Sequence, residues 1–168
     1  MAAANTHRIR PVRADEVDEL FAMICELAEF ERSRDQVQSS ADDFRVALFG
    51  PDPKLFGLVV EDGGGLGGFA VWYVNFSTWT GKHGIYLEDL YVRPHLRGQG
   101  AGKALLGELA RICVSRGYPR LEWWVLDWNA AAISFYRSID ALSMGEWTVN
   151  RLGGAALERA ARGWPAAT

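Results

Sequence analysis

Apolar residues recur at three- and four-residue spacing in two long stretches, and this spacing is typical of amphipathic helices. The first stretch covers residues 17–30 and the second covers residues 101–116. Gly117 follows the second stretch as a helix-stop signal. Two shorter helices are predicted, one capped by Ser40 and one capped by Asn129. The chain therefore has about four predicted helices, with a further short helix possible in its tail.

Alternating or continuous apolar runs predict strands between these helices. The predicted strands cover residues 7–12, 55–61, 69–76, 85–92, 121–126 and 146–152. The glycine-rich segment 62–68 precedes a strand and no helix, which favours a hairpin turn over a phosphate loop. The order of elements predicts an α+β domain with a mixed, mostly antiparallel sheet of six to seven strands. We expect residues 1–168 to form a single domain, with a core at about 8–152 and a tail at 153–168.

Composition and charge narrow the classes of partner. The formal net charge of −3 argues against a nucleic-acid-binding surface, which needs a basic face. No apolar window is long enough for a membrane span, and the N-terminus lacks a signal-peptide core. We therefore expect a cytoplasmic protein. No cysteine–histidine cluster has metal-binding spacing, so no metal site is predicted.

The most informative stretch, residues 86–102, joins a strand, a glycine-rich turn and a helix N-terminus. The N-terminus of a helix offers unpaired N–H groups and a positive dipole end, so this arrangement predicts a phosphate site. The strand also carries the adjacent acids Glu88 and Asp89. These acids point to opposite faces if the strand is regular.

The glycine-rich turn, Arg-Gly-Gln-Gly-Ala-Gly at residues 97–102, resembles the acetyl-CoA loop of the GNAT N-acetyltransferases. Residues 86–92, 127–129 and 134–136 are similar to the diamine (spermidine/spermine) acetyltransferase branch of that family. The similarity extends over about residues 8–152. It implies the GNAT fold and direct transfer of an acetyl group from acetyl-CoA to a small primary amine.

The resemblance assigns cofactor-binding residues. It implies that the loop backbone holds the pyrophosphate of acetyl-CoA, that the end of the preceding strand binds the pantetheine arm, and that the fourth helix also contacts the cofactor. A bulge in that strand would separate it from the next strand and leave a slot for the cofactor. The residues concerned are Leu90, Tyr91, Val92, Arg97, Gly98, Gln99, Gly100, Ala101, Gly102, Lys103, Asn129 and Ala132.

The resemblance also implies catalytic and substrate-binding residues. Tyr136 would protonate the leaving thiolate, and Glu88 would activate the amine, directly or through water. Phe30, Glu31, Glu88 and Asp89 would line the substrate end. The chemistry is consistent with these roles, because freeing an alkylammonium of pKa ~10.4 at pH 7 costs roughly 4 kcal/mol, and a nearby carboxylate both attracts the cation and accepts a proton.

Structural interpretations stand beside these roles. Glu88 could form a salt bridge, Asp89 could face solvent, and Tyr136 could be a core or rim side chain. The tryptophans at 123, 124 and 128 fit sheet packing better than an aromatic substrate cage. Phe30 stands where the diamine branch often has tyrosine, which leaves both a diamine and a lysine-like acceptor such as thialysine open.

Alternative functions also remain open at this point: a protein or peptide acetyltransferase, a non-catalytic acyl-CoA-binding module, or a structural α/β protein with a coincidental loop. Relatives in the diamine branch commonly pair through the C-terminal strand region, so we expect a homodimer.

Overall fold

The computed structural model describes residues 7–163. Its five α-helices are α1 (Val17–Phe30), α2 (Ala41–Phe49), α3 (Ala101–Arg116), α4 (Ala130–Arg137) and α5 (Gly154–Ala161). Its five strands are β1 (Ile9–Pro11), β2 (Phe56–Asp62), β3 (Gly65–Ser77), β4 (Lys82–Val92) and β5 (Leu121–Glu122). The chain divides into two compact units, and the boundary lies between Trp124 and Val125.

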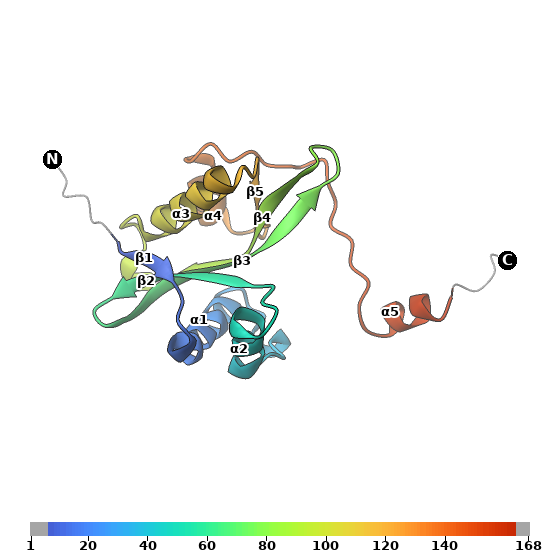
Figure 1. Ribbon diagram of the computed structural model, residues 1–168, viewed down its shortest axis with the longest axis horizontal. Coiled ribbons are helices and arrows are strands. Elements are labelled where there is room, and N and C mark those ends of the chain that lie inside the picture. Colours follow the sequence, from blue (N-terminus) through green and yellow to red (C-terminus); the bar gives the residue numbers. More distant parts are fainter. Residues whose placement is uncertain (1–6, 164–168) are drawn as a thin grey trace. The chain divides into compact units, whose positions relative to one another are not determined.

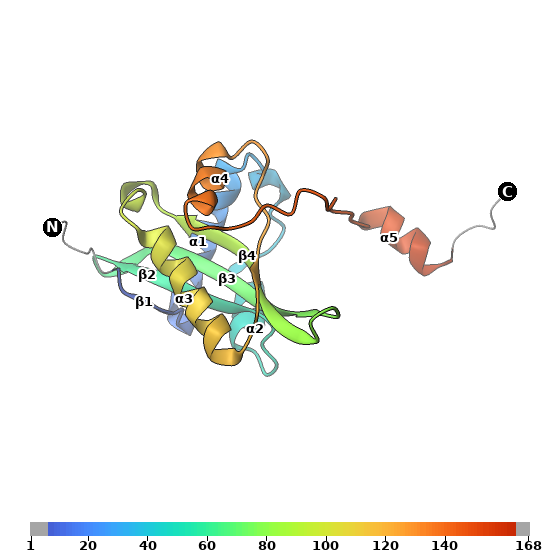
Figure 2. The same ribbon diagram turned by 90° about the horizontal axis from the view of Figure 1, so that it is seen from above.

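The first unit is built on one mixed sheet with the strand order β1-β2-β3-β4-β5. The first four strands pair antiparallel, and β5 pairs parallel with β4. Helices α1 and α2 cover one face of this sheet, and α3 covers the other face (Figures 1 and 2). This arrangement confirms the α+β architecture that was predicted from the order of elements.

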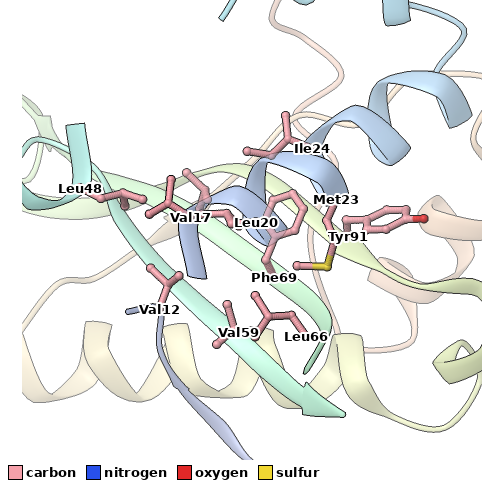
Figure 3. Packing of buried hydrophobic residues seen from close by; sticks show 11 residues of the cluster. Val12, Val17, Leu20, Met23, Ile24, Leu48, Val59, Leu66, Phe69 and Tyr91 are labelled. Carbon is pink, nitrogen blue, oxygen red and sulfur yellow. The ribbon is translucent and has the colours of Figure 1, made fainter. Parts of the chain in front are cut away.

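The core of the first unit lies between α1 and the sheet (Figure 3). Val17, Leu20 and Met23 of α1 are fully buried against Phe69 of β3. They occur at three-residue spacing, which places them on one face of the helix. Complete removal of such side chains from water contributes about 1.5–3 kcal/mol each, so this face fixes α1 against β3 and β4.

Local signals explain where several elements begin and end. Ser40 and Asp43 form a reciprocal capping box at the start of α2. Gly117 ends α3 with a left-handed φ of 67°. Pro11 lies in β1, an edge strand of the sheet, where a missing N–H is tolerated.

The number of strands is lower than predicted. The described residues form five strands, whereas six to seven were expected. Residues 146–152 form no strand, and the predicted strand at 121–126 ends at Glu122. A strand exists only where a neighbouring strand exchanges backbone hydrogen bonds with it. The strand predicted at residues 146–152 from their apolar alternation is therefore wrong for the described chain.

A cluster of ion pairs joins β1, β2 and the short 3-10 helix Ala14–Glu16. The Arg10 guanidinium donates to both Glu16 carboxylate oxygens, at 2.6 and 2.8 Å, and also to Glu61. The hydrogen bond from Arg10 is the main reason why the pKa of Glu16 falls to about 2. Arg13 donates to the same carboxylate at 2.5 Å.

The second unit contains α4, α5 and the irregular segment between them. Several large apolar side chains in this unit are more than half exposed, namely Trp128, Leu142, Met144, Trp147, Val149, Leu152 and Leu157. Across residues 7–163, no helix combines the length and the apolar character that crossing a membrane requires.

Candidate active site

A β-bulge in β4 sets the geometry of the two adjacent acids. Val71 of β3 lies opposite Asp89, but the next β3 residue, Trp72, lies opposite Leu87. Glu88 is therefore an extra residue with no partner across the strand pair. The structure thus contains the bulge that the family resemblance implied.

The bulge breaks the regular alternation that would point the two acids to opposite faces of the sheet. Val71 packs in the core under α1, and Asp89 lies directly across from it on that same face. Glu88 is solvent-exposed and close enough to Asp89 to perturb its ionisation. Asp89 is half-buried, so the idea that it is the solvent-facing neighbour is wrong.

The electrostatic environment of Asp89 disfavours its charged form. Burial, followed by the negative charges of Glu88 and Glu31, raises its pKa to about 6 from an ordinary value of 3.8. Burial also raises the pKa of Glu31, which caps the C-terminal end of α1. The charged groups that act on Asp89 are both acids, and a ligand cation would relieve this repulsion.

The end of α1 meets the mouth of the glycine loop at Arg97. The Arg97 guanidinium lies 5.2 Å from the centroid of the Phe30 ring and 5.4 Å from that of Tyr91. The Tyr91 ring is buried in the core, and its hydroxyl donates to Glu26 at 3.1 Å. Arg97 therefore joins the predicted substrate side, at Phe30, to the predicted cofactor loop.

Arg93 anchors the end of β4 to α1 immediately before that loop. Its guanidinium donates to Glu19 at 3.0 Å, to Glu26 at 3.1 Å and to the Leu66 carbonyl at 2.7 Å. Glu19 also accepts the Leu66 N–H at 3.0 Å. The sequence reasoning missed this network, because the residues joined by its hydrogen bonds are 27 to 74 positions apart and share no local pattern.

The loop before α3 has the geometry of an anion site. Gly98 and Gly100 have φ values of 73° and 90°, a region that favours glycine, and nothing lies within 4 Å of a Cβ built on either. Gly100 is the N-cap residue, and no side chain caps the helix there. The first-turn N–H groups at Ala101, Gly102 and Lys103 lack intrahelical partners and point toward the loop.

One edge of β4 lies open beside this loop. The Arg93 N–H donates to the Gly67 carbonyl of β3 at 2.9 Å. Because backbone groups alternate between edges, those of Leu90 and Val92 face the opposite edge. β5 pairs with only two residues of β4 and ends before reaching them. On this edge, the Val92 carbonyl accepts a hydrogen bond from Arg97 Nε at 2.8 Å.

The remaining predicted site residues are Gln99 of the glycine loop and three residues of the second unit. Gln99 is exposed in the loop, and its side chain donates to the His95 carbonyl at 2.6 Å. In the second unit, Asn129 caps α4 by accepting the N–H of Ala132 at 3.2 Å. Tyr136 lies one turn later in α4, half-buried, with its ring 5.4 Å from that of Phe135.

An aromatic group that the sequence reasoning did not assign to the site lies close to the acids. Tyr73 and Tyr86 face each other across β3 and β4 with ring centroids 5.1 Å apart. Trp124 meets Tyr86 nearly edge-on at 5.6 Å. The available signal was positional, because Tyr86 precedes Glu88 by two residues in the same strand. Tyr73 also lines a cavity of about 540 Å³ with Ala47, Pro53, Lys54, Leu55, Phe56 and Val74.

Comparisons with known proteins agree with this geometry. Residues 17–140 match the model of a family described as the acetyltransferase (GNAT) family. The chain is 35% identical over 165 residues to the thialysine N-epsilon-acetyltransferase of Mus musculus, and the alignment covers 92% of this chain and 96% of the relative. The enzyme of the same name from Caenorhabditis elegans is 35% identical over 151 residues, covering 88% and 92%.

A solved structure has the same fold. An integron cassette protein from the mobile metagenome of V. cholerae superposes with a TM-score of 0.76 at 26% identity. The match covers 92% of this chain and 97% of that one.

Proposed function

The chain belongs to the acetyltransferase (GNAT) family and is an acetyl-CoA-dependent N-acetyltransferase, and on this premise we propose that its acceptor is the primary amine of a small polyamine-like or lysine-like molecule. One observation carries the proposal. The bulge at Glu88 sets Asp89 on the face of β4 next to α1 with Glu88 exposed beside it, and the same strand leads into an uncapped, glycine-rich anion site.

The residues of the first unit fit acetyl-CoA. The backbone N–H groups from Gly98 to Lys103 would hold its pyrophosphate, with Arg97 at the mouth of the loop. The open-edge backbone groups of Leu90 and Val92 would bind its pantetheine arm. When bound, acetyl-CoA supplies an acetyl group already activated as a thioester.

The acids would prepare the amine. Asp89, held at a raised pKa of about 6, is ionised at neutral pH and would hold the acceptor's ammonium in place of a protein cation. Glu88, exposed in the bulge, would take the proton that the ammonium must lose, directly or through water. Phe30 and Glu31, at the end of α1, would line the same pocket.

Tyr136 is proposed as the acid that protonates the leaving thiolate, and Asn129 and Ala132 as further cofactor contacts. Support comes from the family resemblance and from the position of Asn129 as the cap of α4. The variant Tyr136→Phe should lower kcat roughly 100-fold and leave coenzyme A affinity unchanged. An unaltered kcat would remove Tyr136 from this role.

The reaction itself is tested by incubating the protein with acetyl-CoA and a panel of diamines, lysine analogues and a lysine-containing peptide. Mass spectrometry should show a singly acetylated small amine and little acetylated peptide. Acetylation of the peptide alone would favour the protein acetyltransferase alternative. Coenzyme A binding without any acetylated product would favour the non-catalytic binding module.

We also propose a homodimer and a cytoplasmic location. The exposed apolar side chains at Trp147, Val149 and Leu152 support the homodimer, because they fall in the segment 146–152 that alternates like a strand but has no strand partner in the described chain. Light scattering coupled to size-exclusion chromatography should give twice the 18.6 kDa chain mass. Cell fractionation tests the location.

A further inference from the structure

The aromatic side chains Tyr73, Tyr86 and Trp124 form a continuous row in the first unit, which we call the aromatic wall. Adjacent ring centroids are 5.1 Å apart between the tyrosines and 5.6 Å apart between Tyr86 and Trp124. The second contact is nearly perpendicular, with an interplanar angle of 83°. Both separations lie in the range of favourable aromatic pairs.

The aromatic wall lies on the same face of the sheet as Asp89. Tyr73 follows the core residue Val71 by two positions in β3, so the two side chains share a face. Tyr86 lies directly opposite Tyr73, and Asp89 lies directly opposite Val71. The four positions therefore belong to the α1 side of the sheet.

The wall and the acids are also close enough to interact. Burial raises the pKa of Tyr86, and the negative charge of Glu88 raises it further. The same two causes, in the same order, raise the pKa of Tyr73. The two tyrosine rings therefore lie next to the carboxylates, and the aromatic wall extends from Tyr86 to Trp124.

Trp124 ends the wall with most of its surface open. Its side chain is 61% exposed even though it contacts Tyr86. Aromatic faces attract alkylammonium groups through the ring quadrupole and also bury methylene chains. At the other end of the aromatic wall, Tyr73 borders the cavity of about 540 Å³, a volume typical of small-molecule pockets.

We propose that Trp124 is a specificity-determining residue, and that with Tyr86 it holds the methylene chain and the second cationic group of the acceptor. This inference rests on the proposed function, since Asp89 and Glu88 are assigned to the reacting amine. It selects one acceptor chemistry, an alkyl chain with a cationic group at each end. The cationic group of an alkylamine that has only one would bind at Asp89 and Glu88, and no second cationic group would reach Trp124.

The test compares two acceptors of equal chain length, 1,5-diaminopentane and pentylamine. Trp124→Ala should lower kcat/KM for the diamine roughly tenfold, mainly through KM, because it removes the wall's outer face. The value for pentylamine should fall less than about threefold. Trp124→Phe, which retains an aromatic face, should restore most of the diamine activity. The KM for acetyl-CoA should not change.

A matched control truncates an exposed apolar side chain on the opposite face of the sheet. Val114 of α3 is 81% exposed, and Val114→Ala should alter neither acceptor's kcat/KM. Thermal unfolding of each variant identifies a general loss of folding. The inference is overturned if Trp124→Ala lowers both acceptors equally, if it lowers neither, or if the unaltered protein does not prefer the diamine.

Calorimetric titration of 1,5-diaminopentane separates this inference from the proposed function. Failure of the proposed function would be an absence of acetylated product with every amine. Diamine binding that weakens roughly tenfold in Trp124→Ala would still support the aromatic wall in that case. Binding that is unaffected by the substitution, or not detectable in the unaltered protein, would overturn the inference.

Discussion

Two groups of carboxylates in the first unit have opposite electrostatic environments. Glu16 is surrounded by arginine donors, and hydrogen bonding to Arg10 lowers its pKa to about 2. Asp89 lies in a similarly sheltered place, but burial and the acids Glu88 and Glu31 raise its pKa to about 6. The negative charge of Glu16 is stabilised by arginines of the fold itself. The negative charge of Asp89 is destabilised by its surroundings, as expected of a carboxylate in a site that binds a cationic ligand.

The difference also separates stability from function. Breaking the ion pairs around Glu16 should weaken the fold and leave the reaction intact. Removing the charge of Asp89 should weaken the reaction and strengthen the fold. The predictions below test this contrast, beginning with the largest effect.

Asp89→Asn should lower kcat/KM for the amine about 100-fold, or roughly 3 kcal/mol, because the ammonium loses its buried counter-charge. Most of the loss should fall on the KM for the amine, whereas Glu88→Gln should mainly lower kcat. Steady-state kinetics at pH 7.5 measures both variants. A normal amine KM in Asp89→Asn would assign the ammonium to another residue.

Glu16→Gln should lower the free energy of unfolding by about 3 kcal/mol at pH 7, since Arg10 and Arg13 lose a shared partner. The pKa of Glu16 is about 2 in the folded chain against an ordinary 4.5. Its stabilising contribution is therefore present above pH 4.5 and disappears as the pH falls toward 2. Urea unfolding at pH 7 and pH 3 should show the deficit shrinking with acidity, with kcat/KM unchanged at pH 7.

Asp89→Asn should raise the free energy of unfolding by about 2 kcal/mol at pH 7.5. A carboxyl whose pKa is higher in the folded chain than in the unfolded chain favours folding when protonated. That advantage is complete below pH 3.8 and is lost as the pH rises through 6. The gain in the variant should therefore vanish near pH 4. A variant less stable than the unaltered protein at pH 7.5 would mean that Asp89 has a stabilising partner in the fold.

The pH dependence of kcat/KM in the unaltered enzyme should also report the titration of Asp89. Below pH 6 Asp89 becomes protonated and no longer attracts the ammonium, so kcat/KM for the amine should fall by up to about tenfold per pH unit. Asp89→Asn should flatten this acidic limb. An identical limb in the variant would assign the titration to a different group.

The sequence predicted those parts of the molecule that local patterns determine. The apolar spacing of α1 and α3, the cap at Ser40 and the glycine stop at Gly117 all correspond to the structure. The loop at residues 97–102 was likewise recognisable, because strand, glycines and helix follow one another directly in the chain.

Other features depend on pairing between distant segments, and alternation along one strand does not reveal them. The bulge at Glu88 arises from the register between β3 and β4, and it moved Asp89 to the face next to α1. The segment 146–152 has strand-like alternation but no described partner. The contact of Trp124 with Tyr86 joins a residue of β4 to one that follows β5, so its neighbours in sequence gave no reason to place it in the site.

An exposed ion pair provides the smallest expected effect and a baseline for the comparison. Arg45 donates at 2.5 Å to Asp42 within α2 and at 2.5 Å to Asp18 in α1, and both acids are largely exposed. Solvent screens such pairs, so Asp42→Asn should shift the melting temperature by less than about 2 °C and leave kcat/KM unchanged. Differential scanning calorimetry measures the shift. A change as large as that of Glu16→Gln would show that contact with arginine stabilises a carboxylate equally well whether or not the pair is sheltered from water.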